Sequence, residues 1–541
     1  MPFARKPQGW PIELHVGLLI LFAMCMVGLW MVPVLFTGLP LAVPELSLGK
    51  VFLETGELPL TASRLMPVFV AFFAQCIPWL DFPKWSLLAG VAFAASLLPW
   101  WGSIALLMDR RVAWVSTVIL AMMPIYWLQA MILTYYSFAF FFLFLAFFLF
   151  IALQPLSRTA ALLASGVSFG LCIAVKDTFI IFLPWFVLAY LWVHRRTWAK
   201  AIGHIILFGC ALFAFFALPV APQVLMSDAP TPQKILSLLP IDRSKPSWDH
   251  FYPDQYTYEF DREWFDAQAL ENDAHRGLLD RLQNEHRLVS FGLVSSLRSL
   301  RNGAWFTIGT IPDYFLQDYV GGVFLWLFIL PGAMALYKRD KRLLFLMVGL
   351  SLSMTFIVRF LLHFERSHLM NDGWILAMLG GIGVCALADT FAKSWKKTTA
   401  TSIVVIATLC ISLQLLQANR VQLARMYGKT RIPEYLAITG AMAQAPDAAI
   451  IAVPNGIGFA PLVDRHVQVF RPETIERLLQ SKGITKAFAY YGVTHTLGYD
   501  DALTKRIAAA SPKTQILTAA VDQEEKIVVT PAMEFLLHIF R

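Results

Sequence analysis

The hydrophobic residues of this chain are concentrated in eleven long, mostly apolar runs that polar segments separate. The runs cover residues 13–36, 84–108, 112–131, 134–153, 159–175, 178–194, 201–222, 320–337, 343–362, 369–389 and 399–417. An apolar helix of about 20 residues crosses the roughly 30 Å hydrocarbon layer of a bilayer. The pattern therefore predicts a polytopic α-helical membrane protein with about 11 transmembrane helices.

The short polar segments between these runs alternate in charge. Basic residues precede the first run and then occupy every second connection, as Arg5, Lys6, Arg110, Arg111, Arg158, Arg195, Arg196, Lys200, Lys338, Arg339, Lys341, Arg342, Lys393, Lys396 and Lys397. Short loops rich in Lys and Arg stay in the cytoplasm because their translocation is opposed during insertion. We therefore expect a cytoplasmic N-terminus, and we expect the long polar segments 37–83, 223–319 and 418–541 on the outer face.

One apolar stretch inside the first outer segment does not fit this alternation. Residues 65–80, LMPVFVAFFAQCIPWL, form a stretch that is short for a transmembrane helix and contains two prolines. Counting them as a span would also reverse the charge pattern of every later loop. We interpret the stretch as an interfacial or re-entrant helix. Re-entrant backbone needs protein or water around it, so the stretch indicates a cavity at the outer face.

The chain is expected to form two domains. Residues 1–420 form a transmembrane domain, whose outer loop 223–319 is expected to be a small, mostly helical cap. Residues 421–541 have the composition of a soluble domain. Expected helices at 433–445, 472–482 and 500–511 alternate there with the strand-like runs AAIIAV, KAFAYYG and EKIVVT. That alternation favours a small α/β domain on the outer, periplasmic face.

Composition and motifs exclude several classes of protein. Hydrophobic residues make up 57% of the chain and charged residues 15%, unlike a soluble domain. The net charge of +8 requires no nucleic acid, because cytoplasmic loops hold most of the excess and suit anionic lipid. All six cysteines lie in hydrophobic runs, which indicates neither disulfides nor a Cys-based zinc site. The chain has no Gly-rich phosphate loop, HExxH motif or nucleophile elbow.

The first outer loop contains candidate acidic residues, Glu45, Glu54 and Glu57. A carboxylate held beside a cavity at the membrane surface is a candidate general base. The alternative is that these glutamates are simply solvated loop charges.

A second candidate is the pair Lys176 and Asp177, in the short outer connection between the fifth and sixth runs. An ammonium at this depth is costly unless it faces a cavity, pairs or reaches the interface. Lys176 therefore either contacts a lipid-linked phosphate or forms an interfacial ion pair with Asp177, and the sequence leaves both open.

The third candidate is the outer turn FIVRFLLHFERSHLM, residues 356–370, between the ninth and tenth runs. It contains Arg359, His363, Glu365, Arg366 and His368. No other short outer loop has a cationic cluster, so this turn is an exception to the charge rule. Arginine recognises phosphate through two parallel hydrogen bonds, which favours an anionic ligand over a structural ion pair.

Four stretches carry a family resemblance. They are KVFLETGELPLTASRLMPVFVAFFA (50–74), ALLMDRRVAWVSTVILAMMPIYWLQAMILTYYSFAFFFLFLA (105–146), GVSFGLCIAVKDTFIIFLP (166–184) and RFLLHFERSHLM (359–370). Together they resemble the C-type (GT-C) membrane glycosyltransferase superfamily. The likeness is greatest to its bacterial branch, related to protein O-mannosyltransferases and lipid A aminoarabinose or galacturonate transferases, and it covers about 1–420.

The resemblance implies a sugar transfer from a polyprenyl-phosphate donor to a glycan, lipid or protein acceptor at the outer face. Glu45 would be the catalytic acidic residue, acting as base or orienting the acceptor. The resemblance implies donor-phosphate contacts from Lys176, Arg359, Arg366 and His368, with Glu57, Arg64, Asp177 and His363 as secondary candidates. The family's usual acidic pair is a lone glutamate here, and an acidic residue of the fourth span is replaced within 134–137. The sequence thus indicates no cofactor and leaves divalent-metal dependence open.

Two other functions are consistent with the sequence. A carrier or flippase for lipid-linked saccharides would place ionisable residues near the middle of its spans, whereas here they cluster at the outer ends. A glycan polymerase or ligase would use outer arginines without the acid of the first loop. Each of these functions places the protein in the bacterial inner membrane, with membrane lipids as partners and no nucleic acid.

Overall fold

The computed structural model describes part of the chain, and the structural account concerns that part. The described residues are 11–37, 64–77, 86–131, 135–193, 197–226, 322–353, 370–394, 397–426, 440–442, 444–446, 449–453, 466–469, 472–480, 482–490, 492–498 and 501–518.

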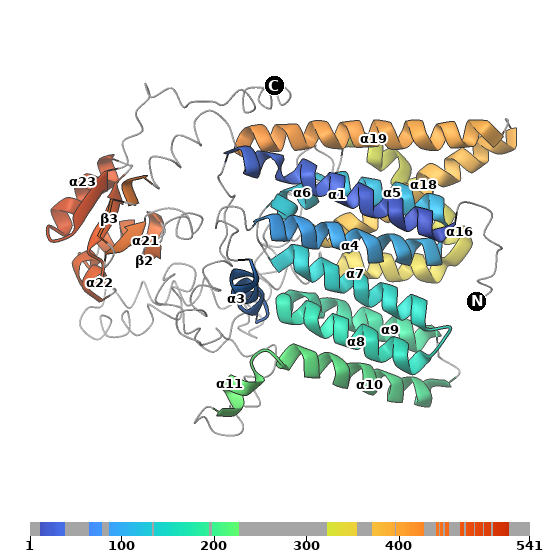
Figure 1. The fold of residues 1–541 in the computed structure, drawn as a ribbon, viewed down its shortest axis with the longest axis horizontal. Helices are drawn as coiled ribbons and strands as arrows, with labels where there is room; N and C mark the ends of the chain where they lie inside the picture. Colours follow the sequence, from blue (N-terminus) through green and yellow to red (C-terminus); the bar gives the residue numbers. More distant parts are fainter. Residues whose placement is uncertain are drawn as a thin grey trace.

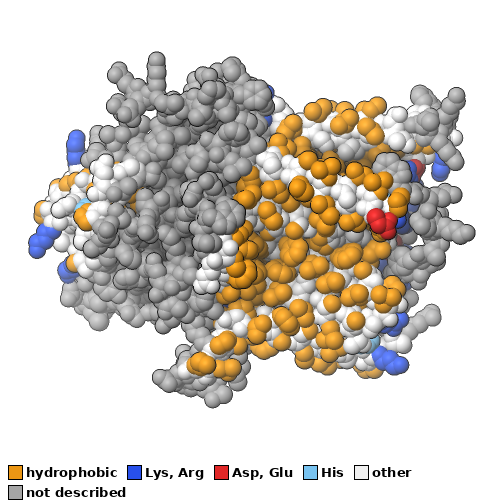
Figure 2. All heavy atoms as spheres, viewed as in Figure 1, with side chains coloured by type: hydrophobic (Ala, Val, Ile, Leu, Met, Phe, Trp, Pro, Cys, Tyr) orange, Lys and Arg blue, Asp and Glu red, His pale blue; other side chains and the backbone are white. Residues whose placement is uncertain are grey.

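The described helices of the first 426 residues lie side by side in one bundle (Figure 1). Its helices are α1 (Ile12–Thr37), α4 (Ser86–Leu107), α5 (Arg110–Met122), α6 (Pro124–Met131), α7 (Tyr135–Leu153), α8 (Arg158–Val175), α9 (Phe182–Val193), α10 (Trp198–Ala217), α16 (Val323–Ser353), α18 (Met370–Ser394) and α19 (Lys397–Met426). Seven of the described helices are long and apolar enough to cross a membrane, and the bent pair α5–α6 would make eight. Apolar side chains cover the side of the bundle, as expected of a surface that faces lipid (Figure 2). The polytopic helical architecture is therefore confirmed.

The other predicted runs also contain helix, although these helices are not among the seven or eight candidate spans of the described residues. The described part of the run 178–194 forms the 3₁₀ turn η2 (Asp177–Ile181) followed by α9. The runs 320–337 and 343–362 meet in α16, whose two arms join at the non-helical residue Asp340. The carboxylate of Asp340 accepts hydrogen bonds from the backbone N–H groups of Arg342 and Leu343, which starts the second arm.

A proline breaks the third predicted span. Met123 has an extended backbone and precedes Pro124, and the axes of α5 and α6 differ by 61°. Proline disfavours the helical conformation of the residue before it, which accounts for the break at this position.

Glycines bring neighbouring helices into close contact. Gly332 of α16 lies against the carbonyl of Leu379, and Gly383 of α18 lies against the carbonyl of Phe328. A Cβ at either position would overlap the partner backbone. Small residues at such crossings permit the close packing by which helices associate in lipid. Close backbone contacts therefore position α16 against α18.

The short helix α3 (Met66–Cys76) lies at one end of the bundle. Its 11 residues rise about 16 Å, too little to cross a bilayer. Phe69 packs on Phe138 and Phe142 of α7, and the N–H of Leu65 donates to the carbonyl of Ala174 at the end of α8. The sequence prediction of a short helix here is confirmed, and the helix occupies fewer residues than the predicted stretch.

The C-terminal residues form a small α/β unit beyond that same end of the bundle (Figure 1). Four parallel strands stand in the order β2-β1-β3-β4. The elements are β1 (Ile450–Val453), β2 (His466–Val469), α21 (Pro472–Gln480), α22 (Ile484–Tyr490), β3 (His495–Gly498), α23 (Asp501–Ala510) and β4 (Gln515–Thr518). Arg506 of α23 donates two hydrogen bonds to Glu476 of α21, and these raise the pKa of the guanidinium. The predicted α/β class is confirmed, whereas the division at residue 420 stays a prediction.

One predicted strand of this unit is wrong. The run KAFAYYG, 486–492, lies mostly in helix α22. Its buried residues Ile484, Ala487 and Phe488 follow a spacing of three and four, which is the period of a helix face. Ala and Phe alternate over a few residues, which gives the run the two-residue period expected of a strand. The run AAIIAV contains β1 as predicted, and EKIVVT lies outside the described residues.

Candidate functional site

The two ends of the helix bundle contain different polar groups. We call the end at which α8 ends and α18 begins the Lys176 end, and the end at which α4 ends and α5 begins the Arg111 end. The Lys176 end faces the α/β unit in Figure 1. The residues of the candidate site that the structure describes all lie there.

Lys176 terminates helix α8 with an extended backbone. Its ammonium nitrogen Nζ lies 3.9 Å from the centre of the Tyr135 ring, at the start of α7. The side chain is half-buried, and it forms no ion pair or hydrogen bond with any side chain among the described residues. The predicted alternative of a Lys176–Asp177 ion pair is therefore not what the structure contains. An aromatic face compensates an ammonium only partly, by about 0.5–2 kcal/mol, so this charge can still bind an anion.

Arg64 lies beside the same end of α8. Its side chain is 3% exposed, and its guanidinium carbon Cζ lies 4.4 Å from the centre of the Phe216 ring of α10. The next residue, Leu65, is hydrogen-bonded to Ala174 at 3.0 Å. That backbone hydrogen bond brings the chain segments of Arg64 and Lys176 together, so two cations from distant parts of the sequence occupy one end of α8.

Asp177 is the first residue of η2 and is half-buried. It contributes a carboxylate next to the Lys176 backbone, at the start of a short helical turn. Thr178, which follows it, has a buried hydroxyl that finds no hydrogen-bond partner among the described residues. The turn between α8 and α9 thus contains one buried hydroxyl, that of Thr178, which the packing of the described residues does not use.

The structure adds an acidic residue that sequence reasoning missed. Asp372 lies in the first turn of α18 and is 5% exposed. Its Oδ1 accepts a hydrogen bond of 2.7 Å from the hydroxyl of Ser351 on α16. Two residues earlier, the Met370 carbonyl accepts a 2.6 Å hydrogen bond from the hydroxyl of Tyr126 on α6. The available signal was an aspartate four residues into an otherwise apolar run, immediately after the Arg/His turn.

The remaining predicted site residues lie outside the described part of the chain. They are Glu45, Glu57, Arg359, His363, Arg366 and His368. Their roles stay predictions. Among the residues that the structure does describe, no cluster of His, Cys, Asp and Glu could hold a metal ion.

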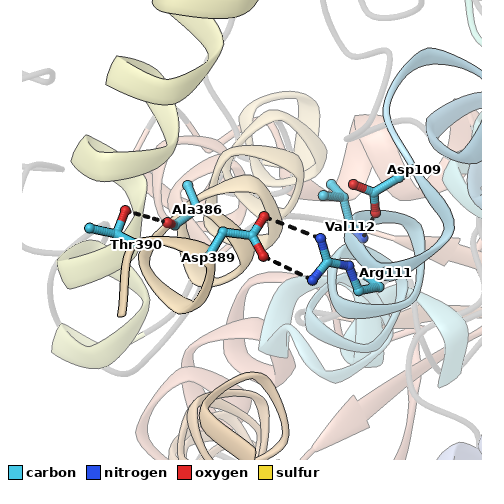
Figure 3. Close-up of polar contacts among 6 residues, drawn as sticks. All are labelled: Asp109, Arg111, Val112, Ala386, Asp389 and Thr390. Carbon is cyan, nitrogen blue, oxygen red and sulfur yellow. Dashed lines mark hydrogen bonds and ion pairs between the residues drawn. The ribbon is translucent and has the colours of Figure 1, made fainter. Parts of the chain in front are cut away.

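The Arg111 end is built differently. Arg111 of α5 donates two hydrogen bonds, of 3.0 and 3.1 Å, to the carboxylate of Asp389 on α18 (Figure 3). Both side chains are about half exposed, at 53% and 52%. Asp109 accepts from the N–H of Val112 and so caps α5. Arg339 of α16 donates to the carbonyls of Leu107 and Met108. These hydrogen bonds connect the ends of neighbouring helices, and the charged side chains that form them are at least partly exposed to solvent.

Comparisons with known proteins bear on the fold alone. No protein-family model and no curated protein matches the chain. The crystal structure of ArnT from Cupriavidus metallidurans in the apo state superposes with a TM-score of 0.50 at 11% identity, over 93% of this chain and 89% of that one. The chain is structurally similar to a C-type membrane glycosyltransferase.

Two further solved structures align less closely. ArnT from Cupriavidus metallidurans bound to undecaprenyl phosphate gives a TM-score of 0.49 at 11% identity, with coverage of 93% and 89%. The oligosaccharyltransferase of Archaeoglobus fulgidus in complex with zinc and sulfate gives 0.48 at 13% identity, over 82% of this chain and 58% of that chain. Both proteins are C-type membrane glycosyltransferases. The similarity to apo ArnT confirms the family resemblance of the sequence at the level of fold.

Proposed function

We propose that this protein transfers a sugar from a polyprenyl-phosphate-linked donor to an acceptor at the outer face of a membrane. Its fold is similar to that of ArnT, and ArnT has been crystallised with undecaprenyl phosphate. The observation that carries the proposal is the Lys176 ammonium, which is half-buried, held against the Tyr135 ring and without an ion-pair partner among the described residues. A lipid phosphate supplies the anion that such a group lacks.

The proposal includes a membrane topology. Eleven spans result if α9 and the two arms of α16 cross the membrane together with the eight candidates. The described basic residues of alternate connections lie at the Arg111 end, which we place in the cytoplasm with the N-terminus. The Lys176 end and the domain 421–541 would face the periplasm of a bacterial inner membrane.

The chemistry follows from the charge that develops during transfer. When the bond between the sugar and the phosphate breaks, the polyprenyl phosphate leaves with additional negative charge. Lys176 would stabilise that charge, together with Arg359, Arg366 and His368 of the turn between α16 and α18. Glu45 would take the proton of the acceptor hydroxyl, which makes its oxygen a better nucleophile.

The remaining candidates would support the same site. Arg64 would add positive charge from the end of α3, since its segment is hydrogen-bonded to the end of α8. Asp177, Glu57 and His363 would orient or balance the charges around the phosphate. The acceptor would approach from the side of the α/β unit.

A donor-hydrolysis and transfer assay tests this proposal. Purified protein in lipid is incubated with a panel of polyprenyl-phosphate sugars, and released polyprenyl phosphate is measured. We expect release by the wild type and a loss of about tenfold or more in Lys176→Gln, because a charge-assisted hydrogen bond contributes about 1.5–3 kcal/mol. Lys176→Arg should retain part of the activity.

The matched control is Lys200→Gln, which makes the same chemical change at the Arg111 end. It should leave release unchanged, whereas Glu45→Gln should abolish it without affecting folding. Equal release by the wild type and both Lys176→Gln and Glu45→Gln would contradict the assigned site. Absence of release with every donor would contradict the enzymatic function.

A further inference from the structure

The helical turn at the centre of α16 carries an unusual concentration of charge. Residues 338–342 read Lys-Arg-Asp-Lys-Arg, so that four cations and one carboxylate occupy five successive positions. The helix path breaks only at Asp340, where both arms of α16 meet. The cations therefore crowd around one tight turn at the Arg111 end of the bundle.

Two of these five residues are used by the fold. Asp340 caps the second arm through the N–H groups of Arg342 and Leu343. Arg339 donates to the carbonyls of Leu107 and Met108 at the end of α4. Both sets of contacts fix the position of the turn, and neither involves the side chains of the other three cations.

Lys338, Lys341 and Arg342 are exposed, and their side chains form no hydrogen bond or ion pair within the described residues. This distinguishes them from Arg111, whose charge is matched by Asp389 at the same end of the bundle. Tyr337, which is 62% exposed, precedes them in the sequence. Three exposed cations and a tyrosine hydroxyl thus belong to one short segment of α16.

Both arms that lead to this turn have exposed apolar residues. Exposed apolar side chains follow the first arm at Leu327, Leu330 and Met334, and the second arm at Phe345 and Val348. The spacing of three and four residues places Leu327, Leu330 and Met334 on one face of the first arm. On the second arm, Phe345 and Val348 are three residues apart, and Phe345 also packs against Trp185 and Trp192 of α9. A lipid whose acyl chains lie along these apolar residues places its headgroup at the turn. Exposed tyrosine at this level is typical of the membrane interface.

We propose that the α16 turn is a binding site for the headgroup of an anionic phospholipid. Lys338, Lys341 and Arg342 bind the phosphate and any second acidic group, while Tyr337 donates a hydrogen bond. The acyl chains lie against the exposed apolar residues of both arms. Basic clusters next to a transmembrane helix attract anionic lipid, and the fixed geometry of this turn concentrates that attraction at one site. This inference does not depend on the proposed sugar transfer.

The test compares two triple variants of equal charge. Lys338→Gln/Lys341→Gln/Arg342→Gln removes the site, and Arg158→Gln/Lys200→Gln/Lys393→Gln removes three exposed cations from separate turns at the same end. Each protein is titrated with phosphatidylglycerol in detergent, and bound lipid is counted by native mass spectrometry. We expect retention to fall by at least about tenfold in the first variant and to change less than about twofold in the second.

Zwitterionic phosphatidylcholine and soluble glycerophosphate serve as probes of specificity. Neither should compete with phosphatidylglycerol for the wild-type site. Competition by glycerophosphate at similar concentrations would identify a soluble-phosphate site and overturn the proposal. An equal loss in both triple variants, or no loss in either, would also overturn it, because the attraction would then be diffuse or absent.

Folding of the variants is checked separately. The thermal transition of each variant in phosphatidylcholine nanodiscs should match the wild type, because the substituted side chains form no hydrogen bond or ion pair within the described residues. If the first triple variant does not fold, the single substitution Lys341→Gln replaces it. If Lys341→Gln folds and retains as much phosphatidylglycerol as the wild type, the proposal is overturned.

Discussion

The two ends of the helix bundle differ in how far their charged side chains are exposed to solvent. At the Arg111 end, charged side chains are solvated and either pair with carboxylates and carbonyls or remain exposed. At the Lys176 end, charged groups are drawn into the protein: Arg64 and Asp372 are almost fully buried, and Lys176 is half-buried against an aromatic ring. Burying a charge costs free energy unless a partner compensates it. The contacts at the Arg111 end anchor helices, and the proposed ligand site is at the Lys176 end.

The largest expected effect contrasts an aspartate from each end. Asp372→Ala should destabilise the protein by about 3 kcal/mol, because it removes a buried carboxylate and leaves its partners unsatisfied. Asp389→Ala should cost less than about 1 kcal/mol, because Asp389 and its partner Arg111 are half exposed to solvent. Thermal or denaturant unfolding of the two variants in one detergent gives the comparison.

A third variant, Asp372→Asn, sharpens this contrast. It keeps an oxygen that can accept from the Ser351 hydroxyl, so its stability should lie between that of Asp372→Ala and the wild type. Equal stabilities of Asp372→Ala and Asp389→Ala would show that burial does not separate the two ends.

The second effect concerns the aromatic ring that holds Lys176. Tyr135→Leu should lower sugar transfer by about two- to thirtyfold, because a partly buried cation–π contact contributes about 0.5–2 kcal/mol to holding the ammonium in place. Tyr135→Phe keeps the ring and should retain most of the activity. Initial rates of polyprenyl phosphate release measure both, and an identical loss in the two variants would assign the effect to the hydroxyl group instead.

The smallest effect is expected for the exposed ion pair. Arg111→Gln should cost about 0.2–1 kcal/mol of stability and leave transfer unchanged, because the pair is solvated and far along α5 from the Lys176 end. The difference in stability between the wild type and Arg111→Gln should become smaller at high salt, because salt screens exposed charges. Thermal melts over a salt series follow this dependence; a loss of transfer without a loss of stability would show that the Arg111 end takes part in the reaction.

The sequence predicted the bundle well because lipid imposes a strong and local constraint. Each apolar run contains helix, since backbone groups in hydrocarbon must be satisfied within the segment. The break at Met123 could also have been anticipated from Pro124, but the run 112–131 looked continuous by hydropathy. The small α/β unit was less predictable. Its strands have only four residues each, and the run 486–492 shows how a short apolar pattern fits helix and strand alike.

The candidate site was predictable only in part. Lys176 was identifiable because an ammonium at the end of an apolar span has an evident cost. Its contact with Tyr135 was not, because it depends on how α7 meets α8. Asp372 was overlooked for a similar reason, since its burial follows from the crossing of α18 with α16 and not from its neighbours in sequence. Arg64 became significant only when the backbone hydrogen bond between Leu65 and Ala174 placed it beside α8.

Binding of undecaprenyl phosphate to the purified protein tests the central claim most directly, without requiring the correct sugar. The affinity is measured for the wild type, Lys176→Gln and Lys200→Gln in the same detergent. The account predicts binding that is about tenfold weaker in Lys176→Gln and unchanged in Lys200→Gln. Equal affinities of Lys176→Gln and the wild type would contradict the assignment of the Lys176 end as the lipid-phosphate site.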